Sequence, residues 1–506
     1  MTGALVPMVV AASTLPAAAA GNSLTVTTIS RHGVRISESV TLENLSSFQE
    51  YQATSGKALY LPRGQYAVIT DVEDSTTDTI GSRVVNVSGT TNVTIDARQG
   101  RPVNVSLNVA APGTFQRYVD ARVCAGNGPA QVEASNNAGS LFVIPDSSKV
   151  FDFAYLAAWQ GKSNYAVSGA DTDGVPAAPG GSYRTASLAR LNIQVRSGTD
   201  TVEPTTNVPV TVQPDPATDG CQTDLWGPVG NYSLPAATSV SVSPGDWTAR
   251  TDPSGDGLGE MTSPVGMLAG HTYWQTFNQA VWGPVVSVPE VWEHQISLDA
   301  GSLIADPTPG VLSFWSTLGT YELSQGSKVL HKQTLTEYGV GPSSFSTRVS
   351  AAGWYNLTVS AHRYLPGTPI PASILSNDVA LSFHFYVNPA VQEIAPVYLT
   401  RFFPGGLNAA NQAPPNTTTG VTLMLDREDN DPSDIAMPTD SASSVKVWAS
   451  VNGGATWRAV TVKKVDGHWV AEVPDPASGV VSLRSEVTDT HGNSAVETVY
   501  RAYAIG

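Results

Sequence analysis

The pattern that most constrains this chain is the alternation of apolar and polar residues with a period of two. In residues 103–109, Val103, Val105, Leu107 and Val109 alternate with polar residues, so the four side chains share one face of a half-buried strand. The same alternation returns in residues 354–361 and 381–387. Residues 151–159 fit a short helix or a strand about equally well. Since no long amphipathic helix accompanies these strands, the sequence predicts an all-β protein.

Length and turn content predict several β-sandwiches in tandem. A chain of 506 residues corresponds to about three domains at roughly 150 residues each, and to four if the domains are small. Glycine and proline together reach about 16% of the residues, against an average near 12%, which favours many turns. We therefore expect tandem sandwiches of the immunoglobulin-like and prealbumin-like kinds.

Composition shifts and turn signals divide the chain into expected domains. The turn Leu61-Pro62-Arg63-Gly64-Gln65-Tyr66 resembles the Leu-Pro-x-Gly-x-Tyr turn of small prealbumin-like modules. The dipeptides Asn452-Gly453 and Asp466-Gly467 are strong hairpin signals, because a type I′ turn needs positive φ at both central positions. The expected domains are a prealbumin-like module at 23–97, a large β domain at 98–300, a β-sandwich at 301–390 and an immunoglobulin-like or fibronectin-type sandwich at 391–506.

Charge and hydropathy exclude two classes of partner. The formal net charge is −16, with only 27 basic residues in the whole chain, whereas nucleic-acid binding depends on clustered Lys and Arg. After the N-terminus, no stretch of 18 apolar residues occurs, so the sequence predicts no membrane span. The expected partner is a protein or a cell-surface polymer. The oligomeric state is left open.

The N-terminal residues predict export. Residues 1–20 are small and apolar and end in three alanines before Gly21, which fits a signal peptide and a secreted, extracellular protein. The first basic residue is Arg31, so either the true start lies upstream or the segment is an Ala-rich leader. In an oxidising compartment the two cysteines, Cys124 and Cys221, are expected to form a disulfide, with two buried thiols as the alternative.

Four segments, in order, resemble a known family. They are TIDARQGRPVNV at 94–105, LAGHTYWQTFNQAVWGP at 268–284, APVYLTRFFPGGLNAANQAPPN at 395–416, and a C-terminal group made of NGGATWRAV, VSLRSEVTDTHGN and TVYRAYAI. Together they are similar to the C-terminal accessory region of secreted subtilisin-like (S8) serine peptidases of actinobacteria. In the second segment Phe277 stands where that family usually has Trp.

The resemblance implies a non-catalytic protein. It covers the region that follows a protease domain, and the GTSMA-type serine turn of a subtilase is absent here. The segments most similar to the catalytic Asp and His motifs of a subtilase, residues 171–174 and 491–494, lie in turn-rich β regions. We expect a secreted accessory, docking or binding protein without its own catalytic site. The alternatives are a fragment or degenerate paralogue of such a peptidase, and a carbohydrate-binding surface protein.

Other motifs suggest chemistry more weakly. Residues 31–35, RHGVR, match the motif of histidine phosphatases, but that fold is α/β and no downstream His supplies its proton donor. Residues 426–434 are an acidic cluster without the calcium-loop glycine. Five tryptophans between 226 and 292 could bind sugar rings or pack in a core. No cofactor is expected other than calcium, whose loop candidates are Asp252, Ser254, Asp256 and Glu260.

Overall fold

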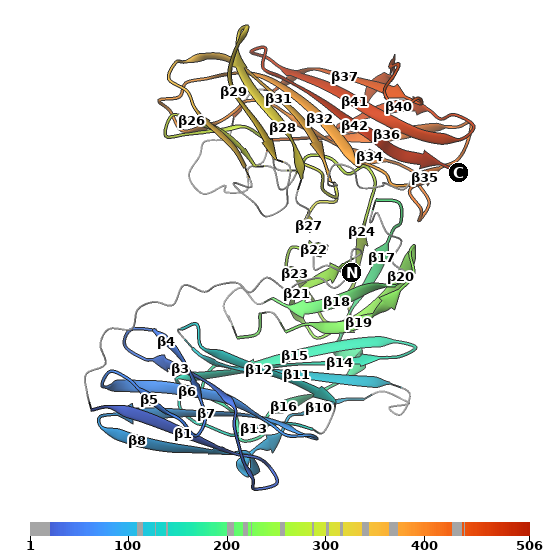
Figure 1. Cartoon of the computed structure of the whole chain (residues 1–506). Helices are drawn as coiled ribbons and strands as arrows, with labels where there is room; N and C mark the ends of the chain where they lie inside the picture. Colours follow the sequence, from blue (N-terminus) through green and yellow to red (C-terminus); the bar gives the residue numbers. More distant parts are fainter. Residues whose placement is uncertain are drawn as a thin grey trace, which may run out of the picture. The chain divides into compact units, whose positions relative to one another are not determined.

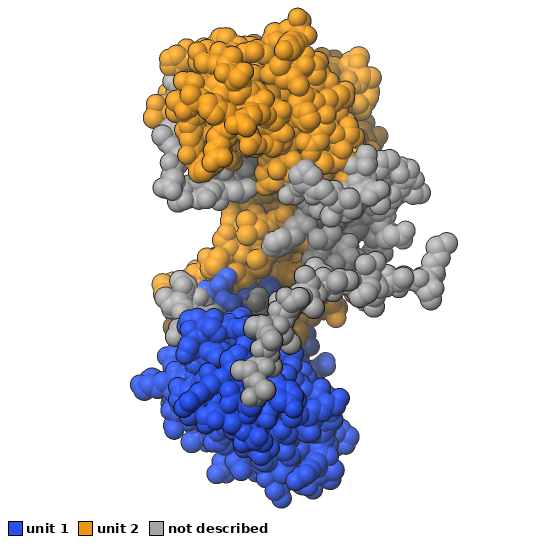
Figure 2. Space-filling view, turned by 60° about the vertical axis from the view of Figure 1, so that its left-hand side comes forward, with its two compact units in different colours: residues 1–188, 213–227 blue, residues 189–212, 228–506 orange. Residues whose placement is uncertain are grey.

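A computed structural model describes residues 21–108, 115–126, 128–137, 140–199, 207–215, 221–223, 225–252, 259–285, 288–299, 303–313, 317–335, 344–363, 373–427, 438–439 and 441–506. These residues form β-strands and two short 3₁₀ helices, Ala97–Gln99 and Thr185–Ser187. The all-β prediction is confirmed, and residues 151–159 are part of strand β14. The chain folds into two compact units, residues 1–188 with 213–227, and residues 189–212 with 228–506 (Figure 2). The domain boundaries expected from the sequence are finer than this division and stay predictions.

Unit 1 contains four groups of paired strands (Figure 1). The first has β1 (Ser23–Ile29) between β2 (Arg35–Ile36) and β5 (Ala58–Tyr60), with β8 (Thr90–Asp96) also on β1. The second runs β4 (Glu50–Thr54), β3 (Ser39–Asn44), β6 (Gly64–Glu73), β7 (Asp78–Val87), β13 (Leu141–Val143), β9 (Arg101–Pro102). The third is antiparallel, β12 (Gln131–Asn137), β11 (Gln116–Ala125), β14 (Phe151–Gln160), β15 (Asn164–Asp171). The fourth pairs β10 (Asn104–Leu107) with β16 (Gly180–Tyr183).

Strand β6 shows why unit 1 has three layers. Its side chains at Tyr66 and Val68 join the hydrophobic core shared with β1 and β8, while Ala67 and Ile69 join the core shared with β11 and β14. Because both faces of this strand are covered, its central residues are continuously buried instead of alternating. The Tyr66 hydroxyl donates to the Pro62 carbonyl at 2.8 Å, which closes the turn that the sequence marked.

Unit 2 contains one wide sheet and four smaller groups (Figure 1). The wide sheet runs β29 (Lys328–Leu335), β28 (Leu318–Gln325), β31 (Gly353–His362), β32 (Asp378–Val387), β42 (Ser494–Ile505), β41 (Gly479–Asp489), β37 (Ala442–Ser450), β38 (Arg458–Ala459), with β35 (Gln412–Ala413) on β42. Two sheets that share its core are β34 (Leu399–Pro404), β36 (Thr418–Asp426), β40 (His468–Pro474), β39 (Thr461–Val465), and β30 (Ser344–Arg348), β26 (Gln295–Asp299), β25 (Glu290–Trp292), β33 (Glu393–Ile394). A third smaller group runs β19 (Gly227–Tyr232), β18 (Val208–Pro214), β21 (Gly245–Thr251), β22 (Glu260–Thr262), β27 (Val311–Ser313), with β23 (Val265–Met267) on β21. The fourth runs β20 (Ala236–Val242), β17 (Ala189–Val195), β24 (Thr272–Phe277).

The wide sheet buries one face in a sandwich core. Tyr355 and Leu357 of β31 and Phe383 of β32 pack in one hydrophobic cluster with Phe402 of β34 and Ile296 of β26. The pairing of β32 with β42 is antiparallel, from Asp378 opposite Tyr500 to His384 opposite Ser494. This pairing joins strands from segments more than one hundred residues apart, and it makes the sheet continuous.

The hairpin expected at Asp466-Gly467 connects β39 to β40. Both residues have positive φ, 49° and 87°, as a type I′ turn requires. Gly453 and Gly454, in the other marked turn, also have positive φ. The type I′ turn is therefore confirmed at Asp466-Gly467. The same prediction is wrong at Asn452-Gly453, where the positive φ angles fall on Gly453 and Gly454 and a longer loop connects β37 to β38.

Unit 1 contains the disulfide that the sequence predicted. Cys124, near the end of β11, is bonded to Cys221 with 5.8 Å between the Cα atoms. The two residues are 97 positions apart in the chain. A cross-link that closes so long a loop removes many conformations from the unfolded chain, which stabilises the folded state.

We predict that the double variant Cys124→Ser/Cys221→Ser unfolds more easily than the native chain. The expected loss is about 2–4 kcal/mol in the free energy of unfolding, because the 97-residue loop is no longer closed. Differential scanning calorimetry under non-oxidising and oxidising conditions measures it. The native protein with reductant should melt like the double variant, and equal melting of all three samples would refute a stabilising disulfide.

Candidate binding face

The side of the wide sheet that faces away from the core is exposed, and we call it the outer face. On β31 and β32, buried core residues alternate with residues that point outward. The outward positions carry Trp354, Asn356 and Thr358 on β31, and Tyr386 and His384 on β32. The face therefore presents aromatic and hydroxyl or amide side chains on two strands that are adjacent in the sheet.

Trp354, His384 and Tyr386 form the first aromatic cluster. Trp354 is directly opposite Tyr386 across the strand pair, and their rings meet edge to face with centroids 5.7 Å apart. The indole of Trp354 lies parallel to the His384 ring at 4.7 Å. Trp354 remains 39% exposed and Tyr386 48% exposed. Tryptophan and tyrosine side chains that combine an apolar body with a solvent-exposed part are enriched at contact sites.

Asn356 contacts His384, a member of the first aromatic cluster. His384 Nδ1 and Asn356 Oδ1 are 2.7 Å apart, and the two residues face one another across the strand pair. The contact requires the proton on Nδ1, since the amide oxygen only accepts. The contact orients the Asn356 amide, which lies on the same face of β31 as Trp354, and does not use its NH₂ group.

A second aromatic cluster, Trp457, Tyr500 and Arg484, lies further along the same face. The Arg484 guanidinium lies 4.1 Å from the Trp457 ring centroid and Tyr500 meets that ring edge to face at 6.5 Å. The Arg484 Nε also donates to the Thr498 hydroxyl at 3.0 Å. Trp457 borders a cavity of about 520 Å³, which is also lined by Val451, Arg458, Val460, Pro474, Asp475 and Pro476 among others.

Two pairs of charged side chains lie on the outer face, one on β28 and β29 and the other on β37 and β41. Lys332 lies 3.1 Å from Glu322, and Lys446 lies 2.8 Å from Glu486. Exposed pairs of this kind contribute little to stability. In each pair the charge of the lysine is balanced by a glutamate.

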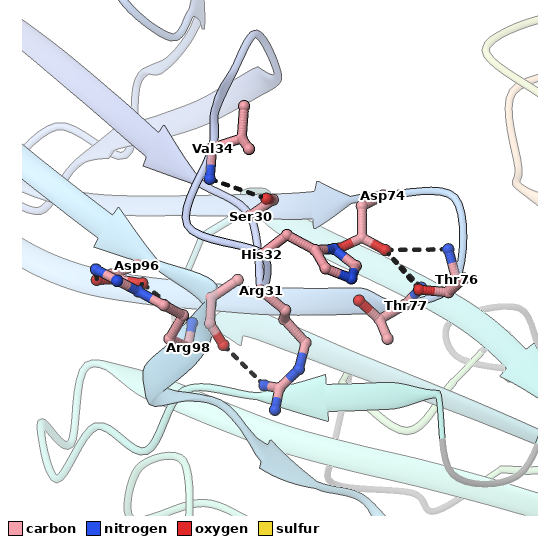
Figure 3. A network of polar contacts seen from close by, with 10 residues as sticks. Ser30, Arg31, His32, Val34, Asp74, Thr76, Thr77, Asp96 and Arg98 are labelled. Carbon is pink, nitrogen blue, oxygen red and sulfur yellow. Dashed lines mark hydrogen bonds and ion pairs between the residues drawn. The ribbon is translucent and has the colours of Figure 1, made fainter.

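The phosphatase-like motif is dispersed in the structure (Figure 3). Arg31 donates to the backbone carbonyls of Ala97 and Gly100 at 2.8 and 3.3 Å, and its guanidinium lies 3.6 Å from the Phe142 ring centroid. His32 is exposed and contacts Asp74 at 3.1 Å. The two motif residues thus have different partners and do not converge on one point.

The Asp74 carboxylate accepts hydrogen bonds from residues of its own turn. Burial acts to raise the pKa of Asp74, but hydrogen bonds from Thr76 and Thr77 outweigh it and hold the pKa at about 2. The carboxylate is therefore ionised throughout the neutral range, as a turn-capping group (Figure 3). It is not a proton donor for His32 chemistry.

We predict effects of different size for the two residues of this motif. Arg31→Ala should lower the free energy of unfolding of unit 1 by about 1–3 kcal/mol, since two buried carbonyl acceptors lose their donor and Phe142 loses its cover. His32→Ala should change it by less than about 0.5 kcal/mol, because that residue is an exposed surface partner. Urea unfolding of the two variants measures both. A larger loss in His32→Ala than in Arg31→Ala would contradict the assignment.

Of the calcium candidates, the structure describes two. Asp252 donates its backbone N–H to the Pro209 carbonyl, and Glu260 is fully buried on β22. Ser254 and Asp256 lie outside the described residues, as does most of the acidic cluster at 426–434, of which Asp426 pairs with Arg401. No group of three metal-ligating side chains occurs in the part of the chain that the structure describes. Calcium binding at this loop stays a prediction.

Glu260 instead faces a second buried acid, Asp306. The Glu260 carboxylate accepts the backbone N–H of Asn278 at 2.7 Å, and Asp306 accepts that of Gln279 at 2.8 Å. Burial, and then the charge of Asp306, raise the pKa of Glu260 well above its ordinary value. Burial also raises the pKa of Asp306 to about 6, against hydrogen bonds from Thr308. At mildly acidic pH this pair therefore holds at least one proton in the folded protein.

We predict that unit 2 loses stability as the pH rises from about 4.5 to 8. The folded state binds the shared proton more tightly than the unfolded chain does, so stability is complete at acidic pH and is lost as the pH passes the raised folded pKa values. Glu260→Gln keeps a donor for Asp306 and an acceptor for Asn278 but does not titrate. Calorimetry should show this variant melting a few degrees higher than the native chain at pH 8 (on the order of 1 kcal/mol) and equally at pH 4.5.

The control for this measurement is Glu486→Gln, which removes a carboxyl group from the exposed outer face. Its melting profile against pH should parallel that of the native chain. A Glu260→Gln profile that is also parallel to the native one would show that the buried pair does not control the pH dependence.

The tryptophans that the sequence singled out do not form one platform. Trp247 and Trp282 are buried, Trp226 is intermediate, while Trp274 is 75% exposed and Trp292 49% exposed. The two exposed rings belong to different sheets, on β24 and β25. The aromatic cluster of the outer face was missed, although Trp354, His384 and Tyr386 occupy the polar positions of two strands whose alternation was recognised. Large aromatics at outward positions are the signal that could have found it.

No protein-family model and no curated protein matches the chain. Among solved structures, it is similar to the FN1–FN3 domains of chicken CNTN1, at 10% identity over 62% of this chain and 99% of that one, with a TM-score of 0.14. The Bacillus anthracis TIE protein matches at 11% identity over 70% and 66%, with a TM-score of 0.14. The immunoglobulin domains 1–5 of Sidekick-1 match at 9% identity over 94% of both chains, with a TM-score of 0.11. Likenesses this weak carry no argument about function.

Within the described residues, no helix is both long and apolar enough to cross a membrane.

Proposed function

We propose that this chain is an exported, multidomain β-sandwich binding protein that docks to its partner through the outer face of unit 2 and has no catalytic site of its own. The observation that carries the proposal is the first aromatic cluster, in which Trp354 and Tyr386 are 39% and 48% exposed although neighbouring rings hold them in place. Exposed aromatic side chains with fixed orientation are the usual anchors of binding surfaces, because little side-chain entropy is lost when they make contact.

Two features support export. The Cys124–Cys221 disulfide is the kind of bond that persists in oxidising, extracellular environments, and the small apolar residues at 1–20 fit a signal peptide. The four collinear segments support a relationship to the accessory region of subtilisin-like peptidases. In that setting, an accessory protein brings a secreted enzyme to its substrate or holds it at a surface.

The absence of chemistry is directly testable. We predict that the purified protein hydrolyses neither casein nor p-nitrophenyl phosphate. The sequence has no GTSMA-type serine turn, Arg31 is engaged by backbone carbonyls and Asp74 is held ionised. Both assays are followed over hours beside a subtilisin and an acid phosphatase. Turnover that disappears in His32→Ala would overturn this part of the proposal.

Docking is tested with material from the organism that encodes the chain. We predict that the native protein binds either its insoluble envelope fraction or a component of its culture supernatant, and that Trp354→Ala/Tyr386→Ala binds at least tenfold more weakly, because the aromatic anchors are gone. Co-sedimentation and surface plasmon resonance measure the two cases.

The matched control is Trp274→Ala, which removes an even more exposed tryptophan from a different sheet. It should bind like the native chain. Equal binding by the native chain, the double variant and the control would remove the outer face from the proposed function.

A further inference from the structure

We propose that the ligand of the outer face is a neutral polysaccharide, with a pyranose ring stacked on the indole of Trp354. The inference rests on the proposed function, because it names the ligand class of the same surface. Four features of the face lead to it: the orientation of the aromatic rings, the polar groups beside them, the local charge and the separation of the two aromatic clusters.

The first feature is the orientation of the Trp354 ring. One indole face lies parallel to His384 at 4.7 Å, with 8° between the planes, and Tyr386 contacts it edge to face. Since the residue is 39% exposed, part of the indole is open to solvent. Such a flat, electron-rich surface matches the C–H groups on one side of a pyranose ring.

The second feature is the set of polar groups around the indole. Asn356 is oriented by His384 at 2.7 Å, and its NH₂ group can donate to a sugar hydroxyl. Thr358 and Ser382 are exposed and directly opposite one another in the next row of the sheet. Hydroxyl and amide side chains both donate and accept, as a ligand covered in hydroxyl groups requires.

The third feature is charge. Two lysines of the outer face are each paired with a glutamate, Lys332 with Glu322 near one margin and Lys446 with Glu486 toward the other. These two lysines therefore offer no unbalanced positive charge to an anionic polymer, and the net charge of −16 on the chain repels one. A neutral polymer experiences no such electrostatic repulsion.

The fourth feature is the separation of the clusters. His362 is eight residues beyond Trp354 on β31, and it lies in the row that continues through Asp378 to Tyr500. At about 3.4 Å per residue, the two aromatic clusters are therefore about 27 Å apart along the strands. Trp457 contacts Tyr500 at that far end. A chain of several sugar units can contact both clusters, whereas a single sugar can contact only one.

Binding is measured by affinity gel electrophoresis and calorimetry with hydroxyethyl cellulose, xylan, mannan, glycol chitin and amylopectin, and with anionic polygalacturonate for comparison. We expect at least one neutral polymer to bind, with an affinity that stays within twofold between about 0.05 and 0.5 M salt, because no ion pair forms. Polygalacturonate should not bind.

Trp354→Ala should weaken that binding at least tenfold, and Trp354→Phe should retain part of it, since a smaller ring still stacks. Trp457→Ala should weaken binding to the polymer but leave the affinity for a short oligosaccharide of the same sugar unchanged, since a short ligand occupies one cluster. Trp274→Ala is the control and should bind normally. Equal melting temperatures of all variants show that each is folded.

Three results would overturn the inference. They are failure of every neutral polymer to bind, salt-sensitive binding to polygalacturonate alone, and polymer binding that is unchanged in Trp354→Ala. If docking to a protein of the supernatant still depends on Trp354 while no polymer binds, the ligand class is wrong and the proposed function stands. If neither depends on Trp354, both are wrong.

Discussion

The backbone pairing of β32 with β42 is the contact on which the arrangement of unit 2 depends. It joins residues 378–384 to residues 494–500 in antiparallel register, so that strands from two distant segments form one sheet. Without it, the first aromatic cluster on β31 and β32 and the second on β41 and β42 would belong to separate surfaces. The register also decides which side chains share a row, because a shift by one residue would turn the whole outer set toward the core.

The sequence predicts the local structure of this protein well. Period-two alternation identifies the strands at 354–361 and 381–387, the Asp466-Gly467 dipeptide identifies its hairpin, and two cysteines identify the disulfide. Each of these signals is contained in a few adjacent residues or in a count. That is why they can be interpreted without knowing which strands are neighbours.

The candidate site could not be predicted in the same way. Trp354 and His384 are thirty residues apart, and their stacking follows from the register of β31 with β32, which alternation alone does not specify. Glu260 shows the converse problem. Its sequence context is an acidic, glycine-containing loop, but its neighbour in space is Asp306, and burial of that pair makes proton sharing its main chemical property.

The margins of the wide sheet bear on the solubility of the molecule. An unpaired edge strand is a template for another chain, and long apolar edges lead to aggregation. Here β29 carries Lys328 and Lys332 on one margin, both exposed, and the opposite margin ends in the two-residue strand β38. Lysine side chains and a very short terminal strand both oppose edge-to-edge addition. A broad sheet can thus expose its flat surface to a ligand while its hydrogen-bonding margins discourage polymerisation of the protein itself.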